Sequence, residues 1–405
     1  MKRHNVFNSE TNQSKKIMKN DYLKYGVGLK SNKETNDFLR CLWSRLATKF
    51  GEIAWHYSPI RTGNNIYVGR VYLGKGIVLD VSLLYKQRGC LSAIIFKPES
   101  SFELEKIKVL LKKSVSEAHS PEKYIHQKNY EIKLDKNISF QKKESKNFII
   151  EGDTIRLKIF GFDKDDCVSM CKIQLQQVCS LLTFDTLRYI TMSGTLIEEI
   201  CEKHNFIATI ENKETEEVAD KMEKNEMYRD LIVSDNMAEY IDSYLERPYE
   251  YENHFTNLEK SVQLFAQGIK YEELSKIAVG FSEPYAEQAI VHYMSALEVI
   301  TLNDKNPEQC KCCGQMRYSI ARRVIDLANS AIKELGKYVK EYYEDRSKYV
   351  HTGLLFSSNN YIGRSIPLMS KNSKTGMIMQ HSVVVNDLKE MIKACIEWHE
   401  KFNVQ

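Results

Sequence analysis

The sequence predicts an α+β protein in which a domain of mixed helices and antiparallel strands precedes an all-helical C-terminal bundle. Residues 65–97 hold three runs rich in Val, Ile, Leu and Tyr, separated by Gly-containing turns, which is typical of an antiparallel sheet. Beyond residue 226, apolar residues recur at three- and four-residue spacings over long segments, which is typical of packed helices. We therefore expect the sheet and the bundle to lie in separate domains.

Length and composition place the chain among globular proteins. It has 405 residues, of which 42% are hydrophobic and 28% charged, enough for two or three packed cores. No apolar run approaches the roughly 20 residues of a membrane helix, and the start, Met1-Lys2-Arg3-His4-Asn5, is polar. We expect a cytoplasmic protein without a membrane partner, with its ten cysteines reduced. A net charge of +4 neither supports nor excludes a nucleic-acid partner.

The first half of the N-terminal domain follows a polar tail at residues 1–20. Its expected elements, in chain order, are a helix over Glu34–Phe50 that stops at Gly51, a meander of strands over Asn65–Leu73, Gly76–Leu84 and Cys90–Lys97, and a helix over Phe102–His119 that covers the sheet. Gly69-x4-Gly74-Lys75 is similar to a phosphate-binding loop. Gly76 stands where that motif needs Ser or Thr, however, and strands flank the segment, so a hairpin turn is favoured.

The second half of this domain continues to about Ile210. Its expected elements are strands over Tyr130–Leu134, Asn147–Glu151 and Thr154–Phe160 and a helix over Asp163–Leu182 with Cys167 and Cys171 on its core face. No group of residues here has the spacing of a metal, nucleophile or acid–base site. We expect the whole domain, residues 21–210, to be a sensor or regulatory domain.

A charged segment over residues 211–226 is expected to link this domain to a helical bundle over residues 227–405. The expected helices of the bundle are Phe255–Glu272, Pro284–Leu302, Met316–Leu335, Gly336–His351 and Val383–Asn403. Pro284–Leu302 is apolar almost all round, which predicts a central position in the bundle.

The strongest candidate site is the stretch Tyr342–Gly353, because it carries Arg346 and His351. A guanidinium matches phosphate, and an imidazole exchanges a proton near neutral pH, so the two together favour phosphodiester cleavage without a metal. Five residues separate them, which places their side chains about 140° apart on a helix. They can converge only near a helix end, and Gly353 predicts that the helix ends just after His351. The alternative is a histidine in the last helical turn beside a surface arginine, without a shared function.

The pattern formed by Tyr343, Arg346, Ser347, Val350, His351 and Gly353 resembles the Arg-x4-His signature of HEPN domains, and most closely their Apea-like branch. The resemblance extends upstream to Ala296-Leu297-Glu298, and nothing before about Asn225 takes part in it. Many HEPN nucleases carry Asn, Asp or His after the arginine, whereas this chain has Ser347.

The resemblance implies an endoribonuclease that needs no cofactor and acts as a homodimer on RNA. Arg346 would stabilise charge on the phosphoryl oxygens and His351 would act as acid or base. Ser347, Tyr343 and Lys348 would contact RNA or position the pair, with Glu298 as an outer partner. It also implies a toxin-like effector of bacterial antiviral defence by abortive infection, with a phage-derived or protein trigger.

Three alternatives stay open. Glu298 could instead pair with Arg322 or Arg323 of the next helix. The bundle could bind RNA, a nucleotide or a partner protein without cleaving anything. It could also serve only for dimerisation.

Two further segments of the bundle contain residues that could bind a metal ion or RNA. Cys310, Cys312 and Cys313 could supply part of a structural zinc site, completed by Cys395, a distant histidine or a second copy of the chain; the alternative is a loop of reduced thiols. Ser357–Gln380 is expected to be a long loop or hairpin whose Arg364, Lys371 and Lys374 either hold an RNA backbone or are simply solvated.

Overall fold

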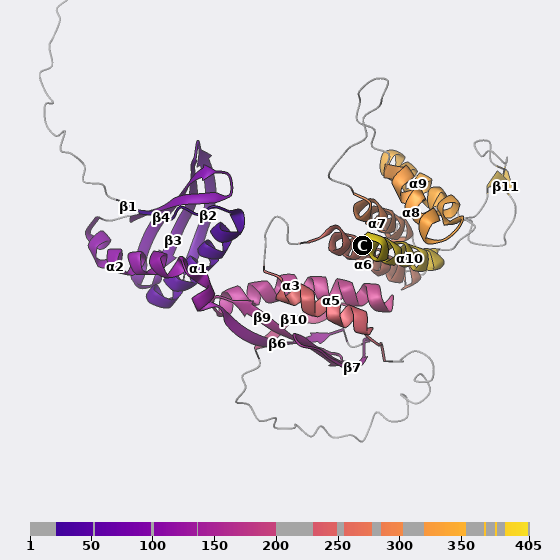
Figure 1. Ribbon diagram of the computed structural model, residues 1–405, viewed down its shortest axis with the longest axis horizontal. Helices are drawn as coiled ribbons and strands as arrows, with labels where there is room; N and C mark the ends of the chain where they lie inside the picture. The colour runs from indigo at the N-terminus through magenta and orange to yellow at the C-terminus, as the bar shows by residue number, and fades with distance from the viewer. Residues whose placement is uncertain are drawn as a thin grey trace, which may run out of the picture. The chain divides into compact units, whose positions relative to one another are not determined.

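The α+β class is confirmed, with antiparallel sheets towards the N-terminus and helices towards the C-terminus (Figure 1). The computed structural model describes residues 22–51, 53–98, 101–135, 137–199, 230–248, 255–277, 285–302, 320–353, 368–369, 377–378 and 385–403. The chain divides into two compact units, Met1–His126 and Gln127–Gln405, which we call unit 1 and unit 2. None of the helices in the described ranges is long and apolar enough to cross a membrane.

Unit 1 contains one antiparallel sheet and two helices. Its elements are β1 (Leu23–Gly26), α1 (Asn32–Phe50), β2 (Ala54–Thr62), β3 (Asn65–Leu73), β4 (Ile77–Gln87), β5 (Cys90–Pro98) and α2 (Ser101–Ala118), and the strand order is β1-β5-β4-β3-β2. The predicted meander and both predicted helices are confirmed. Strands β1 and β2, at the two edges of the sheet, were not predicted.

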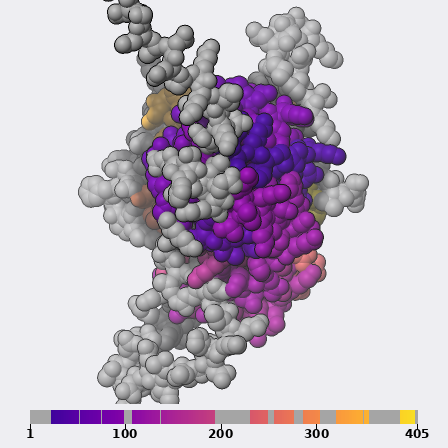
Figure 2. Space-filling model, turned by 90° about the vertical axis from the view of Figure 1, so that its left-hand side faces the viewer, coloured from indigo at the N-terminus to yellow at the C-terminus, as the bar shows by residue number. Residues whose placement is uncertain are grey.

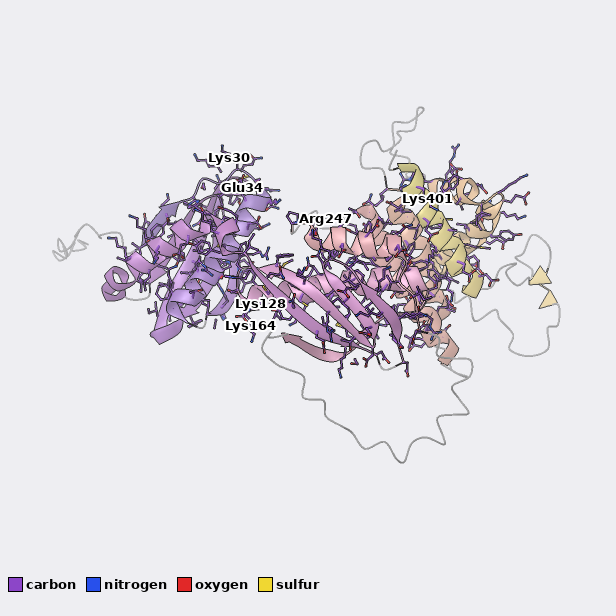
Figure 3. All side chains as sticks on the ribbon, turned by 60° about the horizontal axis from the view of Figure 1, so that its bottom comes forward. Lys30, Glu34, Lys128, Lys164, Arg247 and Lys401 are labelled. Atoms are coloured by element: carbon purple, nitrogen blue, oxygen red, sulfur yellow. The ribbon has the colours of Figure 1, made fainter. Side chains whose placement is uncertain are left out.

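The ends of α1 show why this segment is helical where it is. The Ser31 side chain accepts a hydrogen bond from the Glu34 amide, and the Glu34 carboxylate accepts one from the Lys30 amide, so the first turn is capped from both sides. Lys30 and Glu34 are labelled in Figure 3. Gly51 ends the helix with a φ of 88°, and its amide donates to the Ala47 carbonyl.

The turn after β3 is a hairpin connection and not a phosphate-binding loop. Gly74–Gly76 forms one 3₁₀ turn between β3 and β4. A Cβ atom at Gly74 would collide with the Phe50 carbonyl oxygen, so the glycine is needed for the close approach of two backbones. The described residues of unit 1 are coloured indigo to violet in Figure 2.

Unit 2 contains a second antiparallel sheet. Its strands are β6 (His126–Leu134), β7 (Phe140–Glu144), β8 (Phe148–Gly152), β9 (Thr154–Gly161) and β10 (Met192–Glu199), in the order β10-β6-β9-β8-β7. The predicted strands β6, β8 and β9 are confirmed; β7 and β10 were not predicted.

Seven helices of unit 2 are described together with a short hairpin. They are α3 (Lys164–Thr186), α5 (Asp235–Glu246), α6 (Asn257–Ile277), α7 (Tyr285–Ile300), α8 (Ile320–Ala331), α9 (Leu335–Thr352) and α10 (Val385–Asn403), with β11 (Leu368–Met369) paired to β12 (Met377–Ile378). The predicted helices are confirmed, and α5 was not predicted. The hairpin lies within the expected long loop Ser357–Gln380.

The second sheet belongs with the helical bundle, which differs from the expected division at residues 211–226. Helix α3 contacts β9 as well as α5 and α6, and one hydrophobic core runs from Ile155 of β9 through Val178 of α3 to Phe265 and Tyr293 of the bundle. Helix α3 has buried side chains, including the predicted core thiols of Cys167 and Cys171, and it packs against both the sheet and the bundle helices. It therefore joins the sheet to the bundle. Residues 211–226 themselves lie outside the described ranges.

Helix α7 is central in the bundle, as its apolar sequence predicts. Its contacts include α6, α8, α9 and α10, and Tyr293, Met294 and Leu297 are fully buried. Gly268 of α6 lies directly against the ring of Tyr293, where a Cβ atom would leave no room. The close packing of α6 on α7 therefore fixes the helix that carries Glu298.

Candidate functional site

Helix α9 carries the candidate pair and ends where the sequence predicts. Gly353 adopts a φ of 68° at the C-cap, and its amide donates to the Tyr349 carbonyl at 2.9 Å. His351 therefore lies in the last turn, and its side chain is exposed. On the opposite side of α9, Val339 and Tyr342 are buried in the core of the bundle.

Glu298 of α7 binds two side chains of α9. The Arg346 Nη2 atom donates to Oε2 of Glu298 at 3.1 Å, and the Tyr343 hydroxyl donates to Oε1 at 2.6 Å. The side chains of Arg346 and Glu298 are 21% and 17% exposed, so the ion pair lies at the edge of the core. The guanidinium also lies 5.7 Å from the centre of the Tyr343 ring, within the range of a cation–π contact. We call these three residues the Glu298 cluster.

The electrostatics of the cluster keep Tyr343 in its protonated form. Burial and, after it, the adjacent Glu298 carboxylate raise the pKa of Tyr343 to about 12, against the opposing charges of Arg346 and Arg323. Tyr343 is therefore a hydrogen-bond donor at neutral pH, and it holds the carboxylate in the orientation that meets Arg346.

A third hydrogen bond joins α7 to α9 closer to the end of α9. The Gln288 side-chain amide donates to the Tyr349 hydroxyl at 2.8 Å. Neither residue was a predicted site residue, because a glutamine inside an apolar helix carries no signal for the distant tyrosine that it meets. Together with the Glu298 cluster, this bond fixes the last two turns of α9 on the bundle.

The alternative in which Glu298 pairs with Arg322 or Arg323 is wrong, because Arg346 and Tyr343 bind its two oxygens. Arg322 is 80% exposed and lies 3.6 Å from Asp326, one turn along the same helix. The positive charge of Arg323 acts on the cluster by lowering the pKa of Tyr343. Its Nε atom is buried and has no hydrogen-bond partner among the described residues.

Arg323 also lines a cavity at the end of the bundle. The cavity has a volume of about 580 Å³, and its other polar lining residues include Tyr240, Thr256, Thr301 and His399. Arg323 therefore lies between this cavity and the Glu298 cluster.

Arg346 and His351 do not meet within one chain. No hydrogen bond or ion pair joins them in the described part of the protein, and α9 is continuous from Leu335 to Thr352, so their side chains leave the helix about 140° apart. The Nε atom of Arg346 is buried without a hydrogen-bond partner in the described ranges. One chain thus offers a fixed guanidinium and, on another side of the same helix, an exposed imidazole.

The remaining predicted site residues are only partly described. Ser347 is half-buried on α9, while the side chain of Lys348 and the residues Cys310, Cys312 and Cys313 lie outside the described ranges, as do Arg364, Lys371 and Lys374. Within those ranges, no group of three or more His, Cys, Asp or Glu residues is placed to hold a metal ion. Burial raises the pKa of the Cys395 thiol to about 12, which disfavours the thiolate that zinc requires.

Comparisons with known proteins found no relative of this chain. No family model, no curated protein and no solved structure matches the chain.

Proposed function

We propose that the helical bundle of unit 2 is a metal-independent endoribonuclease of the HEPN type that uses Arg346 and His351. The observation that supports this most directly is the Glu298 cluster, in which a carboxylate and a tyrosine hold the arginine of the motif at the edge of the core. A guanidinium fixed in this way needs no reorganisation when it meets a phosphate, and such preorganisation is a main source of catalytic power.

The proposed chemistry is a transfer within the RNA strand. The 2′-hydroxyl of one ribose attacks the neighbouring phosphorus, the bond to the 5′-oxygen of the next nucleotide breaks, and a 2′,3′-cyclic phosphate remains. The proton leaves the 2′-oxygen, and another is delivered to the departing 5′-oxygen. His351 would take or deliver one of these protons, and Arg346 would bind the phosphoryl oxygens as their charge increases.

A homodimer would supply what a single chain lacks. Arg346 and His351 diverge on one α9, so a twofold axis beside the helix end would bring the arginine of one copy towards the histidine of the other. The exposed Val350, with 51% of its surface accessible, lies next to His351 and would be covered in such a contact. The biological role that fits this activity is that of a toxin-like effector in antiviral defence, with unit 1 controlling it.

The direct test is cleavage of total RNA by purified protein. Wild-type protein should cut RNA in the presence of EDTA and leave cyclic phosphate ends, and His351→Ala should lower the rate by about 10²- to 10⁴-fold. Since His351 is exposed, this variant should melt at the wild-type temperature. Full cleavage by folded His351→Ala protein would remove His351 from the mechanism.

A second candidate function is an RNA-binding or dimerisation module without catalysis. The ion pair of Arg346 with Glu298 favours it, because the carboxylate already neutralises the guanidinium. Binding of RNA by wild-type protein without any cleavage, under conditions in which it forms a dimer, would support this candidate over the nuclease.

A further inference from the structure

The two units differ strongly in charge. Residues 1–126 carry 22 Lys and Arg against 11 Asp and Glu, whereas residues 127–405 carry 36 against 43. The small net charge of the whole chain therefore conceals a basic unit 1 and an acidic unit 2. Such asymmetry within one chain is a mark of nucleic-acid binding by the basic part.

The helices of unit 1 cover one face of its sheet. Helices α1 and α2 contact each other and both contact β5, so they lie on the same side. Trp55 of β2 packs on Trp43 of α1 at 4.7 Å between ring centres; its cross-strand neighbour Val71 is buried, and so is Leu79, which pairs with Val71 on the next strand. Successive residues of a strand point to opposite faces, so the next residue along each strand faces away from the helices.

The opposite face presents a different set of side chains. His56, Arg70, Asp80 and Lys97 are cross-strand neighbours in one row over four strands. A neighbouring row pairs Tyr72 with Val78, and another places Ile60, Tyr67, Ser82, Ile95 and Lys24 side by side. We call this side of the sheet the open face.

The open face is accessible and combines a tyrosine ring and an aliphatic side chain with cations. Tyr72 and Ile60 are 42% and 58% exposed, and His56, Lys24 and Lys97 are exposed as well. These large side chains rise from neighbouring strands, so they provide flat apolar surface between the positive charges.

The charges on the strands are almost all positive. The five strands carry Lys24, Arg61, Arg70, Lys86 and Lys97 but only one acidic residue, Asp80. Asp80 is already occupied, because it lies 3.2 Å from Nε of Arg70 and accepts a hydrogen bond from the Tyr67 hydroxyl at 2.9 Å. Lys24 and Lys97 have no ion-pair partner among the described residues.

We propose that the open face of unit 1 binds single-stranded RNA. Unpaired bases stack on aromatic rings, and lysines beside them bind the phosphates, which is the combination that this face offers. A protein partner fits less well, since lysine is depleted at the centres of protein interfaces. Duplex RNA fits less well too, because its stacked bases are not free to meet Tyr72.

This binding extends the proposed function by giving the RNA a first site outside the bundle. RNA binding by the open face does not require cleavage by the bundle, so an experiment can contradict one proposal without contradicting the other. Full-length His351→Ala protein is the right material, because an active nuclease would destroy the probe. The probe is a fluorescein-labelled 15-nucleotide oligouridine, with a blunt RNA duplex as comparison, and binding is measured by fluorescence anisotropy at several salt concentrations.

Tyr72→Ala should weaken oligouridine binding by about 5- to 100-fold, the usual effect of losing one stacking ring. Tyr72→Phe keeps the ring and should bind as the parent does. Lys24→Ala with Lys97→Ala should reduce the slope of log affinity against log salt by about 1.4, or about 0.7 for each phosphate contact in a single strand.

The matched control removes two exposed lysines from the helices, Lys33→Ala with Lys112→Ala, and should leave the salt slope unchanged. Melting curves confirm that each variant is folded. The proposal is overturned if folded Tyr72→Ala binds like the parent, if the control pair weakens binding as much as Lys24 and Lys97 do, or if the duplex binds at least as tightly as oligouridine. Absence of any RNA binding overturns it as well, and leaves the face to a protein partner.

Discussion

Glu259 and Glu298 are two carboxylates of the same bundle with the same kinds of partner and different surroundings. Glu259 of α6 accepts hydrogen bonds from Arg247, Tyr240 and the Thr256 amide, and it is fully buried. Glu298 of α7 accepts from Arg346 and Tyr343 and remains partly exposed. Arg247, labelled in Figure 3, ends α5, whereas Arg346 lies near the exposed end of α9.

The difference lies in how many donors each carboxylate satisfies. Both oxygens of Glu259 receive an Arg247 nitrogen, at 3.0 and 2.9 Å, and each also receives a second donor. Such a closed network positions α5 and α6 and has no capacity left for a ligand. The Glu298 cluster is open: its carboxylate and guanidinium are partly exposed, and the Nε atom of Arg346 has no hydrogen-bond partner among the described residues. We infer that the first network is structural and that the second is a site.

The largest expected difference between the networks appears when each arginine is removed. Arg346→Ala should lower RNA cleavage by about 10²- to 10⁴-fold and leave the bundle folded, because it removes a donor that acts on the phosphate. Arg247→Ala should lower the free energy of unfolding by about 3–5 kcal/mol, because it leaves the buried Glu259 carboxylate without its cation.

Cleavage rates per folded molecule and urea unfolding curves measure the two effects. The comparison fails if Arg247→Ala, corrected for its folded fraction, loses as much activity as Arg346→Ala. Both arginines would then belong to one functional unit.

Replacing each carboxylate by an amide should give a smaller difference between the two networks, measured as the loss of stability. An amide at position 259 would point its NH₂ group at an Arg247 nitrogen whichever way it turns, so Glu259→Gln should cost about 3–5 kcal/mol of stability. At position 298 the Tyr343 hydroxyl can rotate and accept from the amide, so Glu298→Gln should cost about 1 kcal/mol. Equal destabilisation by the two substitutions in urea unfolding would contradict this distinction.

Arg346→Lys should have an intermediate effect on cleavage. Lysine keeps the charge and can still reach a carboxylate, but it lacks the planar fork that binds two oxygens at once. We expect a rate at least about tenfold below wild type, with unchanged melting. The matched change Arg247→Lys should lower stability and leave the rate per folded molecule intact. A wild-type rate for Arg346→Lys would mean that the fork is not used.

The fold was predictable for helices and strands that have regular apolar spacing and whose ends are marked by residues close in the sequence. Helix α1 and strands β3–β5 have apolar periodicity, α1 stops at Gly51, and glycine-containing turns separate the three strands, so local chemistry specifies them. Strand β2 contains Pro59 in a mostly exposed segment, and it exists because β3 pairs with it at the edge of the sheet. The joining of the second sheet to the bundle depends on burial around α3, which a charged linker sequence does not reveal.

The candidate site was predictable in its residues but not in its contacts. Arg346, His351 and Gly353 are encoded locally, and the helix stop at Gly353 is confirmed. The bonds of Glu298 to Arg346 and of Gln288 to Tyr349 join positions 48 and 61 residues apart, and they arise only from the packing of α9 on α7. The sequence therefore left two interpretations of Glu298 open, one as an outer partner of Arg346 and His351 and one as the partner of an arginine on the adjacent helix α8.

The smallest expected effect is a pH dependence of stability at high pH, and it compares the tyrosines of the two networks. The pKa values of Tyr343 and Tyr240 are both raised from 10.0 to about 12, mainly by burial and then by the adjacent carboxylates. Below pH 10 both hydroxyls are protonated in the folded and the unfolded chain, so their contribution to stability is complete. Between pH 10 and 12 the unfolded chain releases these protons before the folded one, so stability falls as the pH rises.

Tyr343→Phe and Tyr240→Phe should each reduce this alkaline loss, and each should cost about 1 kcal/mol at neutral pH, where one hydrogen bond to a carboxylate is missing. The measurement is the free energy of unfolding in urea at pH 8 and pH 11 for wild type and both variants. If Tyr343→Phe loses as much stability between these pH values as wild type does, the Tyr343 hydroxyl is not held by Glu298. The carboxylate would then be free to move with Arg346, and the preorganised guanidinium on which the nuclease proposal depends would be lost.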